Sequence, residues 1–490
     1  MKDIENKKIL HIETFPDSPL IETSCEIALN LRKKNQVFFF WSGYDLLWTD
    51  WNLRLYKKIL GFNYDYKINI IKKILTNNKV NYLDKIKLEQ KSIDQVLNWS
   101  QKYSTKNKLK NYCFKNINLG VSVESSLLSY YKSYNYRFKK KIIKNALISS
   151  ALVHLRTIEA IKIVKPDIII TFNNRFSISR PIIEAAKKFN IKVIRHEVGS
   201  SENKYELFYK DVHNLDQRCK SIYEYWNKSK KTTRNYFAKK YFNLPYANKD
   251  FINTTGGRTK TFSKLQNEKF FPPINKKIVV FFTSSNYEFD SISTDYLKFA
   301  KSKDFKDQFS AIKSVVEIIN KLPNYVLYLR VHPSSSSYSE ENSHWEKYSK
   351  QKNVFLIRSE SRINSFDMIK KVDFVVSYGS SMAVHAAYNN KPSITLRKHP
   401  FSCSGVLLEP KNKKELYLLL QKKYSNLNLA KRCYPYGNYI LTFGKKFKYF
   451  KTNKIFNGFL LNKKLNHFGF LINFILKIIY PILKFFKNYF

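Results

Sequence analysis

Two parts of the chain alternate short apolar runs with segments whose apolar residues recur every three or four positions. In the first part, the apolar runs are Lys8–Glu13, Val37–Trp41, Asp167–Phe172 and Ile191–Arg195. The segments with helical periodicity in the same part are Leu20–Lys34, Lys139–Val164 and Arg180–Phe189. Short apolar runs are typical of buried strands, and their alternation with helices predicts βαβ units around a parallel sheet.

A second series of the same kind begins at Lys276. The strands expected there are Ile278–Phe282, Tyr325–Val331, Val354–Ile357, Phe374–Ser377 and Ser393–Leu396. Helices are expected between them at Phe305–Lys321, Ser343–Lys350, Ser365–Lys371 and Ser380–Asn389. The chain is therefore predicted to be an α/β protein with two Rossmann-like halves.

Three further segments lie within and beside these halves. Residues from about 45 to 140 are rich in tyrosine, lysine and asparagine, and we expect an insertion with helices at Trp51–Leu60 and Lys85–Lys102. The expected domain organisation is residues 1–200 with this insertion, 201–275 as a polar connecting segment, 276–436 as the second Rossmann-like domain, and 437–490 as a basic, apolar tail.

Composition and charge narrow the possible partners. The 490 residues are 43% hydrophobic and 26% charged, which excludes a disordered or fibrous chain, and the formal net charge is +49. A positive field of this size favours nucleic acid, an anionic membrane surface or phosphorylated substrates. The lysines are spread over the whole chain, and no RNP, KH or zinc-finger pattern is present, so we expect no nucleic-acid partner. Dinucleotide, P-loop and HExxH motifs are also absent.

The cysteines and the first residues bear on the cellular compartment. The five cysteines are widely scattered, and we expect reduced thiols in the cytoplasm. The first residues contain no apolar run after a basic end, and a strand is predicted to begin almost at once.

The first candidate for chemistry follows the second strand of the second half. There Arg330 and His332 precede Pro333 and a serine-rich loop that starts at Ser334. A cation, an imidazole and serine hydroxyls at the end of a strand are suited to binding an anion. The alternative is a strand end capped by a polar turn, with His332 bonded to the backbone.

The second candidate is the segment from Ser377 to His385. A strand ends at Ser377, Gly379 permits a tight turn, and Ser380 or Ser381 is expected to cap a helix whose free amides suit a phosphate. An ordinary capped helix is the alternative. Because both candidates end strands of the same predicted half-sheet, they are expected on one rim, where two anion-binding groups suit a nucleotide.

The order of these motifs resembles a known family. Strand-Arg-x-His-Pro, then Val-x-Ser-x-Gly-Ser-Ser, then a small-residue helix and Lys391-Pro392-Ser393-Ile394 resemble GT-B glycosyltransferases of bacterial surface (capsular) polysaccharide biosynthesis. They are also similar to transferases of CMP-linked sugars, which carry HP and SS motifs. The likeness covers about 276–400 and extends to the opening strand and to the His196-Glu197-Val198-Gly199 segment.

The resemblance implies two Rossmann-like domains that face each other across a cleft, with a nucleotide-sugar donor in the second and a glycan or lipid-linked acceptor in the first. It implies that His332, Ser380 and Ser381 hold the donor phosphate. His385 stands where relatives usually carry an acidic residue that accepts hydrogen bonds from donor hydroxyls, so His385 is either a donor contact or a packed helix residue.

A glycosyl transfer also needs a base for the attacking hydroxyl. Glu197 follows a predicted strand, and Asp17 and Glu13 follow the first strand, so these carboxylates are the candidates, each also readable as a surface or capping residue. Arg175, Arg180 and His196 are candidate acceptor contacts. No acidic DxD signature stands in a suitable loop, and we expect transfer without a metal or other cofactor.

The tail bears on location. Leu465–Phe490 is mostly apolar but contains Lys477, Pro481 and Lys484, which argue against a spanning helix. With the lysines at 445, 446, 448, 451 and 454 it is expected to bind an anionic membrane surface peripherally, or else to pack on the first domain. The function alternatives are a polyol-phosphate transferase or nucleotide-sugar epimerase on the same fold, and, from another class, a non-catalytic scaffold or nucleic-acid-binding protein.

Overall fold

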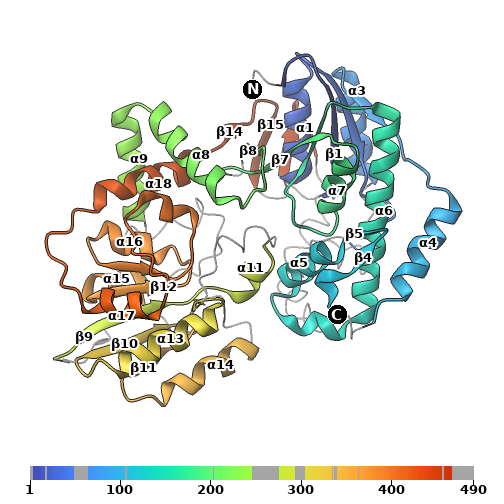
Figure 1. Cartoon of the computed structure of the whole chain (residues 1–490). Helices are drawn as coiled ribbons and strands as arrows, with labels where there is room; N and C mark the ends of the chain where they lie inside the picture. Colours follow the sequence, from blue (N-terminus) through green and yellow to red (C-terminus); the bar gives the residue numbers. More distant parts are fainter. Residues whose placement is uncertain are drawn as a thin grey trace. The chain divides into compact units, whose positions relative to one another are not determined.

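The computed structural model of the chain divides into two compact units, each described here by itself. Unit 1 comprises residues 1–212 and 444–490, and unit 2 comprises residues 213–443. The structure describes residues 4–16, 19–48, 65–104, 108–201, 203–244, 275–292, 304–333, 335, 339–361, 363–454 and 457–465. Each unit contains a mainly parallel sheet with helices on both faces (Figure 1), so the α/β prediction is confirmed.

The sheet of unit 1 runs in the order β14-β8-β7-β6-β1-β2-β3. Its parallel strands are β1 (Lys8–Glu13), β2 (Gln36–Trp41), β3 (Asn81–Leu83), β6 (Ile168–Phe172) and β7 (Lys192–Val198). At its edge, β8 (Lys204–Phe208) and β14 (Lys445–Lys446) are antiparallel. The four strands predicted in this half all form, and β7 is longer than expected because β8 pairs with its last residues.

Alternating side chains of β1 explain how helices cover both faces of this sheet. Leu10 and Ile12 pack in a core with α6 (Lys140–Val164) and α7 (Arg180–Lys188). Ile9 packs in a second core on the other face, together with residues of α1 (Leu20–Leu31) and α3 (Asp65–Asn77). Side chains of one strand point alternately to the two faces, so His11 and Glu13 lie on the α1 face with Ile9.

The segment expected as a helical insertion is divided between the sheet and an added subdomain. Within it, α3 and β3 continue the main sheet and its core, which corrects the expectation that the whole segment lies apart. The rest forms α4 (Gln90–Gln101), the hairpin β4 (Cys113–Phe114) and β5 (Ile117–Asn118), α5 (Gly120–Tyr131) and two short 3₁₀ helices, η2 (Leu109–Asn111) and η3 (Tyr134–Phe138). The helix expected at 51–60 lies outside the described residues.

The described residues after 443 belong to unit 1, which agrees with the alternative that this part of the tail packs on the first domain. The expected boundary at 436 falls inside α18 (Ala430–Thr442), and β14 then pairs with β8. After it come β15 (Phe450–Lys454), β16 (Asn457–Leu460) and β17 (Lys463–Lys464), which form a small antiparallel sheet. Phe450, Leu460 and Leu465 are buried in the core under α1, and this burial explains why residues 444–465 pack on the unit. Residues after 465 are outside the described part of the chain.

The sheet of unit 2 has the strand order β11-β10-β9-β12-β13, all parallel. Its strands are β9 (Lys277–Phe282), β10 (Tyr325–Arg330), β11 (Val354–Ile357), β12 (Phe374–Ser377) and β13 (Ser393–Thr395). This is the order of a Rossmann-type half, in which the first strand stands in the centre. All five strands predicted for the second half are confirmed, and each begins and ends within one residue of its expected bounds.

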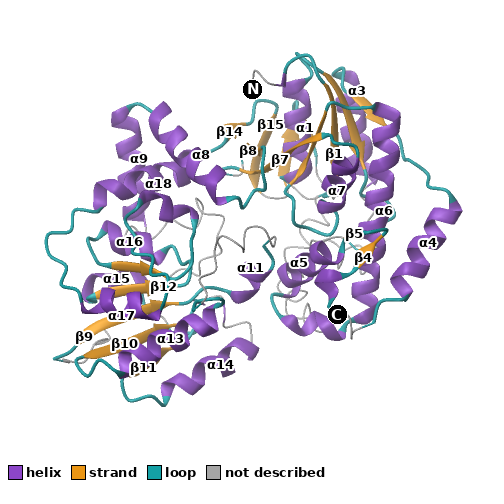
Figure 2. Cartoon of the chain, viewed as in Figure 1, coloured by secondary structure: helices purple, strands orange, loops and turns teal. Residues whose placement is uncertain are grey.

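Helices cover both faces of this sheet as well (Figure 2). One core joins Val279 and Phe281 to α13 (Gln308–Asn320), α14 (Ser339–Ser349) and α17 (Lys413–Gln421). The other joins Val280 and Phe282 to α15 (Ser365–Lys371) and α16 (Met382–Tyr388). The four helices predicted between these strands are present, and α17 was not predicted.

A helical layer completes unit 2. It consists of α8 (Leu215–Lys228), α9 (Lys231–Asn243) and α18, which pack on one another and on α16, and residues 215–243 are therefore more than a polar connection. Cys219 of α8 forms a disulfide with Cys403 of the 3₁₀ helix η6 (Pro400–Ser404), with Cα atoms 5.6 Å apart. The expectation that all five cysteines are reduced is wrong for this pair, because helix packing brings two distant cysteines together.

Candidate functional site

Three neighbouring strands of unit 2 end in polar residues at one rim of the sheet. The central strand β9 is followed by Ser284 and Ser285, β10 by His332, and β12 by the turn that contains Gly379. Because the carboxyl ends of parallel strands meet at one edge, their loops converge there. The backbone N–H of His332 donates to Thr283 Oγ1 at 2.8 Å, which ties the first two loops together.

The turn after β12 has the backbone that the sequence pattern predicted. Gly379 has a φ of +75°, in the left-handed region, and an added Cβ would lie 3.0 Å from Cζ of Phe289. The predicted capping is only partly present. Ser381 makes no capping hydrogen bond with its side chain, whereas Ser380 Oγ accepts a hydrogen bond from the N–H of Met382 at 3.4 Å. The helix that follows, α16, is only 7 residues long, so its first turn offers few free amides and the hydroxyls of Ser380 and Ser381 are the other polar groups of this turn.

His332 is only partly exposed beside this turn. Burial, and to a smaller extent the nearby charge of Arg330, lowers the pKa of His332 to about 4. The imidazole is therefore neutral at pH 7 in the free protein. An anion bound next to it would favour the charged form, and the ring would then donate a charge-assisted hydrogen bond.

Arg330, the last residue of β10, joins this strand to the loop after β11. Its side chain is buried, and its guanidinium donates to the backbone carbonyls of Arg358 and Ser361, the latter at 3.0 Å. Burial lowers the pKa of Arg330 to about 10. Arg330 does not line the pocket described below, and carbonyl oxygens of the loop after β11 accept hydrogen bonds from its Nη1 and Nη2, so the structure does not support the expected direct contact with an anion.

The rim encloses a pocket of about 490 Å³ within unit 2. Four of the residues predicted from the sequence line it: His332, Gly379, Ser380 and Ser381. Ser377 is fully buried beneath the turn and does not line the pocket, and Ser334 lies outside the described residues.

The pocket also contains polar residues that sequence reasoning missed. These are Ser284, Ser285, His213, Arg218 and His399. The run Thr283-Ser284-Ser285 after a predicted central strand was a usable signal for the two serines. The other three come from the helical layer and from the loop before η6, and no local pattern places those segments over the rim.

His385 lies elsewhere. It is 1% exposed and packs against the rings of Tyr241, Phe242 and Phe366, with centroid distances of 5.0 to 5.2 Å. Burial lowers its pKa to about 3, so it is neutral. The structure therefore agrees with the packed-helix alternative and not with a donor contact, because α16 turns this position toward α9 and away from the pocket.

Among the base candidates of unit 1, Glu197 is partly exposed near the end of β7. Its Oε2 accepts a hydrogen bond from Asn173 Nδ2 at 2.6 Å, and its Oε1 accepts one from the N–H of Val198 at 3.0 Å. Glu197 pairs with Glu206 of β8, so it belongs to a strand and not to the predicted loop. Asp17 lies outside the described residues.

Glu13 and His196 are both buried. Glu13 accepts hydrogen bonds from the N–H groups of Thr14 and Phe15 at 2.7 and 2.9 Å and from the hydroxyl of Ser24. Ser24 Oγ lies 2.9 Å from Nε2 of His196. Exposed fractions of 0% for Glu13 and 1% for His196 leave neither side chain open to an acceptor in this conformation.

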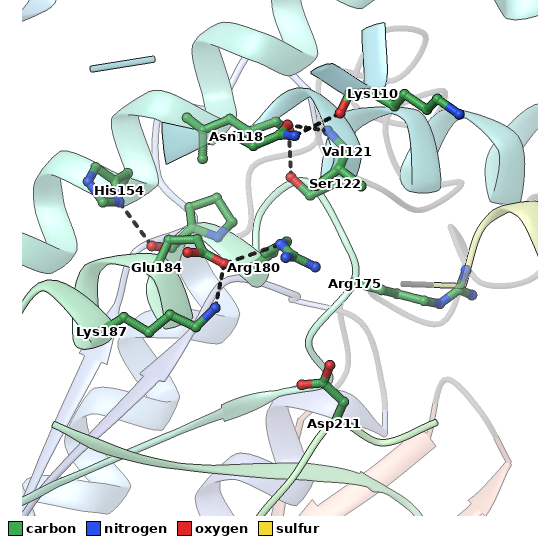
Figure 3. Close-up of polar contacts among 12 residues, drawn as sticks. Lys110, Asn118, Val121, Ser122, His154, Arg175, Arg180, Glu184, Lys187 and Asp211 are labelled. Atoms are coloured by element: carbon green, nitrogen blue, oxygen red, sulfur yellow. Dashed lines mark hydrogen bonds and ion pairs between the residues drawn. The ribbon is translucent and has the colours of Figure 1, made fainter. Parts of the chain in front are cut away.

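The two candidate arginines lie near one another in sequence but have different surroundings (Figure 3). Arg180 is directed at Glu184, with Nε 3.3 Å from Oε1, and Lys187 reaches the same oxygen at 3.1 Å. Arg175 points away from this group, donates to Ser129 Oγ at 2.9 Å and lies over the ring of Phe176. Arg180 is thus engaged in an ion pair within α7.

Several solved structures are similar to the chain at low sequence identity. A KpsC β-Kdo 2,4-transferase of Thermosulfurimonas dismutans is similar over 56% of this chain and 79% of that protein, with 12% identity and a TM-score of 0.35. The MnaA–UDP structure of S. aureus is similar over 89% and 94%, with 12% identity and a TM-score of 0.28. The UDP-GlcNAc 2-epimerase of Methanocaldococcus jannaschii is similar over 87% of this chain and 97% of that protein, with 12% identity and a TM-score of 0.25. No protein-family model and no curated protein matches the chain.

Among the described residues, no helix combines the length and the apolarity that a membrane crossing requires.

Proposed function

We propose that the protein is a glycosyltransferase that uses a nucleotide-sugar donor, bound in the pocket of unit 2. The observation that carries the proposal is the set of polar groups around that pocket: His332, the serines after β9 and the serines after β12. Hydroxyls, an imidazole and the guanidinium of Arg218 suit the phosphate of a nucleotide, and the motif order of the sequence supports the same assignment.

The proposed reaction is a displacement at the anomeric carbon of the donor sugar. The bond from that carbon to the acceptor oxygen forms while the bond to the phosphate oxygen breaks, and the acceptor proton passes to a carboxylate. His332, Ser380 and Ser381 stabilise the charge on the leaving phosphate, an electrostatic role in a preorganised site. Glu197 is the proposed base. Of the two candidate carboxylates that the structure describes, Glu13 is buried and Glu197 is partly exposed to solvent.

We also propose roles for the two units, a class of acceptor and a cellular location. The two units act as the two domains of a GT-B enzyme, with the acceptor on unit 1, where Arg175 is a candidate contact. The acceptor is a growing surface polysaccharide, such as capsule or lipopolysaccharide, or a lipid-linked glycan. The enzyme works in the cytoplasm at the inner face of the membrane, and the transfer requires no metal or other cofactor. The resemblance in motif order to capsular polysaccharide transferases supports this setting.

Calorimetry with CMP-, CDP-, UDP-, GDP- and dTDP-linked sugars tests the donor site. We expect one class to bind the full chain, and His332→Ala and the double change Ser380→Ala with Ser381→Ala to cut turnover by roughly 10²–10³. His344→Ala, on α14 and outside the pocket, is the matched control and retains activity. If no nucleotide sugar binds, or if both pocket variants keep full activity, the donor assignment is wrong.

The same preparation separates a transferase from an epimerase or a polyol-phosphate transferase. A glycosyltransferase releases free nucleotide when an acceptor is present, an epimerase converts the nucleotide sugar with no acceptor, and a polyol-phosphate transferase adds a phosphodiester mass to the acceptor. Mass spectrometry of the products identifies the two transfer reactions, and NMR of the nucleotide sugar identifies epimerisation, which leaves the mass unchanged. Glu197→Gln is expected to abolish turnover and to leave donor affinity unchanged; weaker donor binding in this variant would contradict its role as base.

A further inference from the structure

A second group of chemistry-bearing side chains lies inside unit 1, between the sheet and α1. His11 and Glu13 of β1 and His196 of β7 each place a ligand-type atom within 4.8 Å of the other two. Nε2 of His196 is 3.5 Å from Oε2 of Glu13, and the rings of His11 and His196 have centroids 5.5 Å apart. Since β6 separates β1 from β7 in the sheet, the group spans three strands.

These side chains are buried between the sheet and α1, where apolar side chains lie beside buried polar ones such as Ser24. Exposed fractions are 0% for His11 and Glu13 and 1% for His196, and the same face carries Ile9, Ile170 and Ile194. Burying polar groups is unfavourable unless each finds a partner. An apolar residue would pack there at lower cost, so the presence of two imidazoles and a carboxylate calls for a reason beyond packing.

His11 is the observation that points to a ligand. Neither of its ring nitrogens has a hydrogen-bond partner, although both are buried. Its ring stacks on Phe39 with centroids 5.4 Å apart, and one of its nitrogens lies within 4.8 Å of a ligand atom of Glu13 and of His196. Buried polar atoms of this kind are rare in proteins, and an ion that accepts the lone pair of one nitrogen would remove much of the penalty.

We propose that His11, Glu13 and His196 form a binding site for a single divalent transition-metal ion, with zinc as the ion that best fits the ligands. Two imidazoles and one carboxylate are a common zinc ligand set, and imidazole ligands select such metals over magnesium or calcium. Ser24 Oγ, 2.9 Å from Nε2 of His196, or a water completes a fourth position.

The geometry allows such an ion after a small adjustment. Ligand atoms at 2.0–2.1 Å from a tetrahedral zinc ion lie about 3.3 Å from one another. The present upper limit of 4.8 Å therefore has to shrink by somewhat more than 1 Å, which side-chain rotation can provide. Since the ligands are buried, the ion is structural: it ties β1 to β7 across β6 and does not touch a donor nucleotide.

The test measures metal content in the full chain, with any affinity tag removed. The protein is incubated with Zn²⁺ and dialysed against buffer. Inductively coupled plasma mass spectrometry is then expected to find one zinc ion per chain in the wild type and none in His11→Phe. Phenylalanine keeps the ring stacked on Phe39 and removes the ligand atoms. His344→Gln removes a histidine from α14 of unit 2 and is expected to retain the full zinc content.

Two further readouts make the test independent of catalysis and of how well one variant folds. Co²⁺ in place of Zn²⁺ is expected to give the visible absorption of a four-coordinate site in the wild type. Zn²⁺ is expected to raise the Tm of the wild type and to leave that of His11→Phe unchanged. If the wild type retains no more zinc than His11→Phe, or if Co²⁺ shows only the spectrum of the hydrated ion, the proposal is wrong. Neither readout depends on transferase activity, so the proposed function stands or falls separately.

Discussion

Glu26 provides a direct test of how the C-terminal segment is held on unit 1. Its carboxylate is fully buried on α1 and accepts hydrogen bonds from three backbone N–H groups of that segment, those of Lys448, Tyr449 and Phe450, at 2.7, 2.7 and 2.9 Å. Asn30 Nδ2 donates to the same carboxylate at 2.6 Å. In Glu26→Gln, the negative charge is lost and the new NH₂ group faces N–H donors instead of accepting from them.

The size of the effect follows from these contacts. A hydrogen bond to a charged group contributes about 1.5–3 kcal/mol, and a buried donor without a partner costs about 1–3 kcal/mol. Losing two acceptor contacts is therefore expected to lower the free energy of local opening by about 3 kcal/mol. Since 1.4 kcal/mol corresponds to a factor of ten, amide exchange at Lys448, Tyr449 and Phe450 is expected to accelerate by about 10²-fold.

Hydrogen exchange followed by mass spectrometry measures this acceleration peptide by peptide. Glu5→Gln is the matched control, because Glu5 belongs to the same unit but is 42% exposed and pairs only with Lys34 at the surface. The control is expected to leave the exchange of the segment unchanged. Equal exchange rates in wild type and Glu26→Gln would refute the reasoning, and the pairing of β14 with β8 would then be what holds the segment.

Three further predictions follow from the structure. Gly379→Ala forces a non-glycine residue into a φ of +75°, at a cost of about 1–2 kcal/mol, and calorimetry is expected to show weaker donor binding with the fold retained. The pKa values of His332 and His385, lowered from 6.5 to about 4 and about 3, mean that the unfolded chain binds protons first as the pH falls. The contribution of these two histidines to the free energy of unfolding is therefore complete above pH 6.5 and is lost on acidification toward pH 4. Urea unfolding at several pH values measures this loss. Equal stability at pH 7 and 4.5 would contradict the prediction. A chain ending at Tyr436 lacks half of α18 and the segment on unit 1, and it is expected to be insoluble or to melt at lower temperature; a soluble, fully stable truncation would show that this packing matters little.

Local patterns predicted the elements of both sheets well. The strands β1, β11 and β12 begin and end at the predicted residues, because each apolar run follows a polar residue, Lys7, Asn353 or Asp373 respectively. The strands of the unit 1 sheet that were missed are β3, β8 and β14: β3 and β14 have only three and two residues, and β8 begins with alternating charged and aromatic side chains. Their pairing is stabilised by neighbours far away in the sequence, and a local pattern does not contain that information.

The candidate pocket was predictable to the extent that it is built from strand ends. His332, Gly379, Ser380 and Ser381 follow strands whose order can be read from the alternation of elements, so their convergence could be expected. His213 and His399 line the same pocket from segments without a regular pattern. Their positions depend on how α8, α18 and η6 pack, and that packing is a tertiary property.

Both His332 and His385 were candidate donor contacts, but only His332 lines the pocket, and the reason is physical. His332 follows the last residue of a strand by two positions, where the chain leaves the sheet and side chains face the rim. His385 lies on a helix between Val384 and Ala386, and its ring packs against Tyr241 and Phe242. A motif position conveys a role only where the backbone keeps the side chain at the site. In this chain, the aromatic residues of α9 complete a core around His385, so a nucleotide sugar bound as proposed would need a different partner for its hydroxyls, and Ser284 and Ser285 of the pocket lining are the candidates.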